Sequence, residues 1–68
     1  MVFKTSVESA QHVHLLGPFL DSVAGRGHWN FALDDQDKIL RIASSKVSAE
    51  AAIQLLRQNG FECNELSD

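Results

Sequence analysis

The chain has 68 residues, of which 44% are hydrophobic and 22% charged, which fits one small globular domain spanning residues 1–68. Its formal net charge of −3 argues against a nucleic-acid-binding protein, because such proteins present a basic surface to phosphates. A single cysteine excludes an internal disulfide, favours a reducing compartment and leads us to expect a cytoplasmic protein. No apolar run approaches the roughly 20 residues of a membrane-spanning helix, so we expect no membrane insertion.

The first half of the chain predicts a strand, a helix and a second strand. Apolar and polar side chains alternate over residues 2–7, which is typical of a half-buried strand. Apolar residues then recur at helical spacing from residue 13 to residue 23, and Ser9 is a good N-cap for this helix. Glycines 25 and 27 follow its end, and alternation returns over residues 28–33.

The second half predicts a strand, a helix and a last strand. Residues 34–37 form a polar turn, and a third strand follows at 39–43. Ser48 is the N-cap expected for a second helix, which Asn59-Gly60 ends. Residues 61–66 alternate as the last strand.

This order predicts an α+β fold, the ferredoxin-like βαββαβ sandwich, with a four-stranded antiparallel sheet and two helices on one face. It also brings the first strand–helix junction, the 34–37 turn and the Gly60-Phe61 junction to one end of the molecule. The side chains expected between sheet and helices are Phe3, Val7, Val13, Leu16, Leu20, Trp29, Phe31, Leu33, Leu40, Ile42, Ile53, Leu56 and Phe61. Those expected on the opposite face are Val2, Lys4, Ser6, Asn30, Ala32, Ile39, Arg41, Glu62 and Asn64.

Three stretches carry a resemblance to a known family. They are Val47-Ser48-Ala49-Glu50, Asn59-Gly60-Phe61 and Gly17-Pro18-Phe19-Leu20-Asp21. With the order of elements and the spacing of the helices, they make nearly the whole chain resemble the heavy-metal-associated domains of copper chaperones and metal-transporting ATPases.

The resemblance implies a metal site that this chain lacks. The family's signature is a Cys-x-x-Cys at the first strand–helix junction, where two thiolates bind a soft ion. Here the matching positions are Ser9 and His12, so inherited thiolate binding is not expected. Phe61 matches the position that faces the family's site. We therefore expect no cofactor and a degenerate metal site.

His12 is the one good donor left at that junction, and a single imidazole is too few ligands for a metal centre. Ser9 is better explained as a helix cap than as a ligand. The alternative function is a weak metal carrier that combines His12 with Cys63 or with a ligand from a second chain. A small buried thiol is the default interpretation of Cys63. No acid is placed to orient His12 beside Ser9, so we expect no enzyme.

The remaining expectation is a non-catalytic binding module that acts through protein contacts, with a related domain or a metal transporter as partner. The expected partner surface is the end formed by His12, Asp34, Asp35, Asp37 and Phe61, where three carboxylates suit a basic partner. The open face of the sheet is the competing surface, and it is mostly polar. We expect a monomer, because no apolar patch in the sequence is large enough for a stable dimer.

Overall fold

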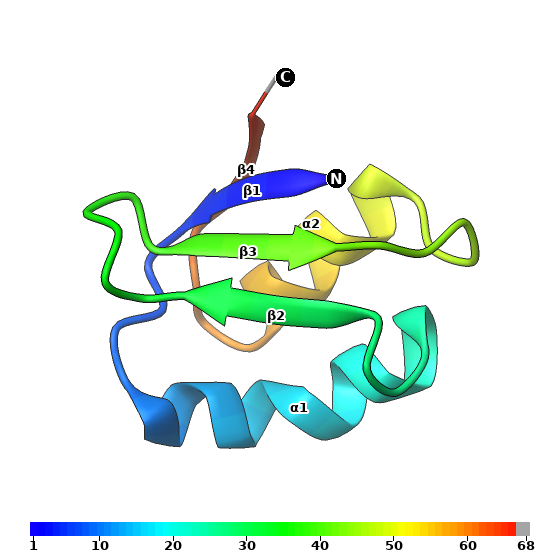
Figure 1. Cartoon of the computed structure of the whole chain (residues 1–68), viewed down its shortest axis with the longest axis horizontal. Helices are drawn as coiled ribbons and strands as arrows, with labels where there is room; N and C mark the ends of the chain where they lie inside the picture. The colour runs from blue at the N-terminus through cyan, green and yellow to red at the C-terminus, as the bar shows by residue number, and fades with distance from the viewer. Residues whose placement is uncertain (67–68) are drawn as a thin grey trace.

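A computed structural model describes residues 1–66, and residues 67 and 68 of the predicted domain lie outside the described part. The elements follow as strand, helix, strand, strand, helix and strand (Figure 1). The prediction of an α+β fold with a four-stranded antiparallel sheet and two helices is confirmed. The bounds are β1 Val2–Thr5, α1 Ala10–Ala24, β2 Trp29–Ala32, β3 Ile39–Ile42, α2 Ala49–Gln58 and β4 Cys63–Leu66.

The first strand lies in the interior of the sheet, whose order is β2-β3-β1-β4. Phe3 of β1 pairs with Leu40 of β3 on one side and with Glu65 of β4 on the other, and both pairings are antiparallel. Strand β2 pairs only with β3, where Phe31 lies opposite Leu40. Strands β2 and β4 are therefore the two edges of the sheet (Figure 1).

Both helices begin at the serines that the sequence indicates. The Ser9 hydroxyl accepts a hydrogen bond from the His12 N–H, and the Ser48 hydroxyl accepts one from the Ala51 N–H. Such caps satisfy donors that the first helical turn leaves without partners. Gly60 follows α2 with a φ of 91°, a conformation that favours glycine. Neither helix within residues 1–66 combines the length and apolar content needed to cross a membrane.

Side chains from both helices share one buried cluster with the inward side chains of the sheet. Of the predicted inward residues, seven are 0–2% exposed and six pack half-buried around them. Ala24 and Val47 also belong to the cluster, although the sequence did not single them out. The seven are Phe3, Val7, Leu16, Leu20, Leu40, Ile42 and Leu56, and the six are Val13, Trp29, Phe31, Leu33, Ile53 and Phe61.

Several sequence expectations need correction. The last strand begins at Cys63, two residues after the predicted start, so Phe61 lies in the connection before it. Ile39 lies on the outward face as predicted, but it is only 5% exposed, because Lys4 and Ala32 flank it on the neighbouring strands. The first strand ends at Thr5, two residues before the predicted end. Val7 is nevertheless fully buried, so the connection after β1 follows the surface of the core.

Candidate functional site

The junction between β1 and α1 is closed by its own hydrogen bonds. The Ser9 hydroxyl is engaged by the His12 N–H at 3.2 Å. The His12 Nδ1 accepts a long hydrogen bond of 3.4 Å from the Glu8 N–H. Because Nδ1 is the acceptor, a neutral His12 carries its proton on Nε2. A metal ion at Nδ1 would have to displace this long bond, and one at Nε2 would require the other tautomer.

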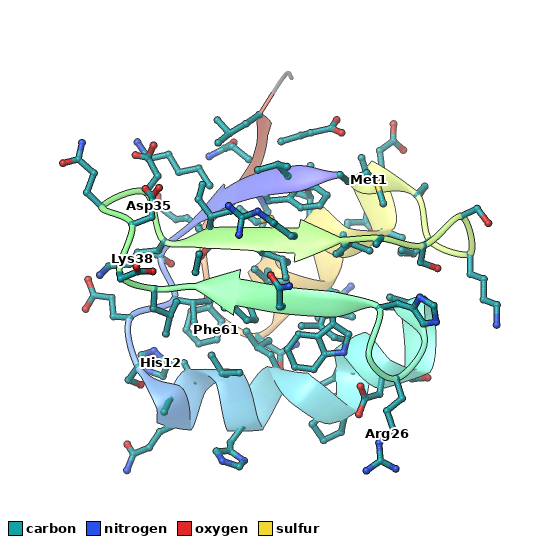
Figure 2. The ribbon with its side chains drawn as sticks, in the orientation of Figure 1. Met1, His12, Arg26, Asp35, Lys38 and Phe61 are labelled. Atoms are coloured by element: carbon teal, nitrogen blue, oxygen red, sulfur yellow. The ribbon has the colours of Figure 1, made fainter. Side chains whose placement is uncertain are left out.

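The side chain of His12 packs against Phe61, which comes from the connection between α2 and β4. The ring centroids lie 5.0 Å apart with an interplanar angle of 63°, an edge-to-face contact. Two hydrogen bonds between Ser6 and Glu62 hold the connections together: the Glu62 N–H donates to the Ser6 hydroxyl at 2.8 Å, and the Ser6 N–H donates to the Glu62 carbonyl at 3.2 Å. His12 and Phe61 thus form one half-buried aromatic pair (Figure 2).

The acidic turn at residues 34–38 is ordered by local hydrogen bonds. The Asp35 carboxylate accepts from the Asp37 N–H at 2.8 Å, and the Asp35 carbonyl accepts from the Lys38 N–H at 3.0 Å. Lys38 has a φ of 51°, in the left-handed region. The Lys4 ammonium lies 3.6 Å from the Asp37 carboxylate. Their side chains are 58% and 42% exposed, so water screens this ion pair and it contributes little to stability.

Thr5 joins that turn to the end of β1, and the sequence analysis did not identify this role. Its hydroxyl donates to the Lys38 carbonyl at 2.6 Å and accepts from the Val7 N–H at 3.2 Å. Its N–H lies 3.2 Å from both the Asp37 and the Lys38 carbonyl oxygens. Thr5 is only 7% exposed. A threonine in an otherwise apolar inward row was the available signal, because a buried hydroxyl needs partners.

The five residues predicted as a partner surface are here named the His12 end: His12, Asp34, Asp35, Asp37 and Phe61. Figure 2 shows His12, Asp35 and Phe61 toward the same end of the molecule, with Met1 and Arg26 toward the other. Asp34 and Asp35 are exposed, whereas His12, Asp37 and Phe61 are half-buried. The turn is tethered beside the β1–α1 connection through Thr5, so carboxylates and the aromatic pair come from three segments far apart in sequence.

Cys63 is a poor metal ligand in this fold. Its side chain is fully buried in the core, as predicted. Burial raises the pKa of the Cys63 thiol from 9.0 to about 11, against a smaller lowering effect of the Arg57 charge. The thiolate that a soft metal requires is therefore disfavoured at neutral pH. Over residues 1–66, no three histidine, cysteine or acidic side chains gather as a metal site.

Replacing Thr5 by valine should destabilise the protein by roughly 1–3 kcal/mol, because the buried Val7 N–H loses its acceptor and the Lys38 carbonyl loses one donor. Urea unfolding measures this change. The matched control is Thr5→Ser, which keeps the hydroxyl and should lose less stability. A larger loss in Thr5→Ser than in Thr5→Val would show that the methyl group of Thr5, and not its hydrogen bonds, matters.

The buried thiol should make stability fall between pH 9 and pH 11. The pKa of Cys63 is higher in the folded state than in the unfolded chain, so the unfolded chain loses the Cys63 proton first as pH rises. Deprotonation then stabilises the unfolded chain relative to the folded state. The contribution of the protonated Cys63 thiol to the free energy of unfolding is fully present below pH 9 and is lost toward pH 11. Denaturant unfolding of the wild type and of Cys63→Ala across this range isolates it. The variant should show the shallower decline, and parallel curves would contradict the assignment.

Comparison with known proteins identifies no relative of this chain. No protein-family model matches it. No curated protein and no solved structure gives a significant match either. The resemblance to heavy-metal-associated domains therefore rests on the motifs of the chain itself.

Proposed function

We propose that this chain is a heavy-metal-associated-like domain with a ferredoxin-like fold that has lost its metal site and serves as a non-catalytic protein-binding module in the cytoplasm. The strand order supports the fold assignment. In β2-β3-β1-β4, strand β3 lies between β1 and β2, and strand β1 lies between β3 and β4. Each strand–helix–strand unit is thus split by a strand of the other unit, and this splitting supports the ferredoxin-like assignment that we propose.

The observation that carries the functional proposal is the closed junction between β1 and α1. Where the family has two thiolates, Ser9 caps the helix and His12 packs on Phe61. A junction built in this way supplies no second soft ligand. The same junction can still contact a partner, because the rings of His12 and Phe61 are only half-buried and lie toward one end of the molecule.

Charge favours a basic partner at the His12 end. Asp34 and Asp35 extend into solvent, and Asp37 is balanced only by an exposed contact with Lys4. Carboxylates at the same end of the molecule as the aromatic pair steer a basic partner toward docking and raise its association rate more than its final affinity. A related domain or a metal transporter with a basic docking face is the partner class that we propose.

Two other roles have less support. Catalysis through Ser9 and His12 would need the hydroxyl to face the imidazole, whereas Ser9 contacts the His12 backbone N–H and the ring contacts Glu8. A weak metal carrier that uses His12 and Cys63 would need a thiolate, whereas Cys63 is buried with a raised pKa. A metal ligand from a second chain would require a dimer, and the proposed module is a monomer.

The wild-type protein should fail to compete for Cu(I) with a chromophoric chelator, whereas Ser9→Cys together with His12→Cys should gain one-to-one binding. The two positions open α1, whose N-terminus favours thiolates, and neither side chain is part of the buried core. His12→Ala is the control, because it removes the one remaining donor. Tight binding by the wild type that disappears in His12→Ala would refute the loss of the metal site, and a folded double variant without gain would refute the alignment of these positions.

Partner contact should map to the His12 end. The titrant is the soluble metal-binding domain of a copper-transporting ATPase from the same genome, followed by amide chemical shifts. Shifts should occur at residues 8–14, 34–37 and 61, and replacing Asp34, Asp35 and Asp37 by asparagine should weaken binding and its salt dependence. The matched control is Glu50→Gln with Glu65→Gln, which removes acidic charge elsewhere. Shifts confined to the open sheet face, or none at all, would contradict the proposal.

A further inference from the structure

A second surface, separate from the His12 end, lies between α1 and the edge strand β2. It is an open groove of about 470 Å³. Val13, Gly17 and Pro18 of α1 line it on one side, and Trp29 of β2 lines it on the other. Gly17 keeps the groove open: a Cβ atom there would lie 3.7 Å from the Trp29 ring, and any longer side chain would extend into the space.

The edge of β2 leaves main-chain groups without partners beside this groove. The His28 carbonyl accepts from the Ala43 N–H at 2.8 Å, so His28 directs its carbonyl toward the β3 side. Backbone direction alternates along an antiparallel strand, so Asn30 and Ala32 also face β3. The N–H and C=O groups of Trp29 and Phe31 must then point away from the sheet. An unpaired edge of this kind is a template for an added strand.

The groove is lined by two charged side chains, the Asp21 carboxylate and the Arg26 guanidinium. The Asp21 carboxylate accepts a hydrogen bond from the Trp29 Nε1–H at 2.8 Å, which fixes the ring in the wall of the groove. Arg26 also lines the groove and is exposed. Within residues 1–66 the one ion pair is between Lys4 and Asp37, so no carboxylate in that part of the chain neutralises Arg26.

We propose that the β2 edge binds an extended acidic peptide segment of another protein as a fifth strand. Hydrogen bonds to Trp29 and Phe31 would hold its backbone. Alternate side chains of an added strand point to the same face as those of Trp29 and Phe31, which is the helix side, so an apolar side chain enters the groove over Gly17. A carboxylate of the peptide pairs with Arg26. This proposal does not depend on the function assigned to the His12 end.

The probe is a phage-displayed library of random short peptides, selected on the wild type and counter-selected on Gly17→Leu. Leucine favours a helix more than glycine does, and its Cβ makes an ordinary contact with Trp29, so this variant should fold with a filled groove. Gly17→Ala is the matched control, because it adds one methyl group and leaves most of the groove open. Enriched peptides should combine an apolar residue with a carboxylate.

Binding of a synthesised peptide is followed by the fluorescence of Trp29, the single tryptophan of the chain, and by amide exchange. Gly17→Leu and Arg26→Gln should each weaken binding at least about tenfold, and Gly17→Ala should not. Exchange at the Trp29 and Phe31 amides should slow when peptide is added. The combined changes Asp34→Asn, Asp35→Asn and Asp37→Asn should leave binding unchanged.

Three results would overturn the proposal. The first is a selection that enriches no peptide on the wild type over Gly17→Leu. The second is an enriched peptide whose chemical shifts map to Leu15 and Phe19, on the outer face of α1. The third is protection of the Trp29 and Phe31 amides that rises with protein concentration alone, which would assign the edge to self-association.

Discussion

The arrangement of the His12 end depends on the hydrogen bonds of one buried side chain, Thr5. Its hydroxyl links the Lys38 carbonyl to the Val7 N–H, so it connects the acidic turn with the chain that leads into α1. A valine would fill the same volume and match the apolar character of the inward row, but it would make neither bond. The threonine is therefore explained by the geometry of the end of the sheet and not by the packing of the core.

The position of Thr5 follows from the position of β1 in the sheet. This strand is hydrogen-bonded on both sides, to β3 and to β4, and its last residue lies opposite Cys63 of β4. The turn before β3 is hydrogen-bonded to the end of β1 through the Asp37 carbonyl. The connection before β4 is hydrogen-bonded to the chain just after β1 through the Glu62 carbonyl. A surface made of three distant segments thus inherits the rigidity of a central strand. Loops placed on such a framework are the usual position for binding residues.

Much of this fold could be predicted from local patterns. Ser9 and Ser48 marked the helix starts, because a hydroxyl before an apolar periodic stretch satisfies orphan N–H groups. The burial of Cys63 also followed from simple alternation along the last strand. These features depend on a few neighbouring residues. For the same reason the proximity of His12 to Phe61 could be anticipated only through the order of the elements, and its edge-to-face geometry could not.

Other features arise only when distant segments meet. Ile39 looked exposed because its strand alternates, but neighbours on two other strands cover it. The wall formed by Gly17 and Trp29 was invisible for a similar reason, since nothing in a helical glycine indicates which ring will lie across from it. Gly17 disfavours the helix in which it lies. The sequence shows this low helix propensity but does not show the contact with Trp29 that explains why glycine is present.

The pair Gly17-Pro18 also determines which interactions stabilise α1. Glycine and proline are the poorest residues for a helix interior, and the proline removes one N–H from the ladder in the middle of fifteen residues. The turns on either side of the pair are too short to persist alone in water. Burial of Leu16 and Leu20 against the sheet supplies the stability that the helix propensity of the local sequence does not provide. Helix α1 therefore owes its stability to packing against the sheet more than to its own sequence.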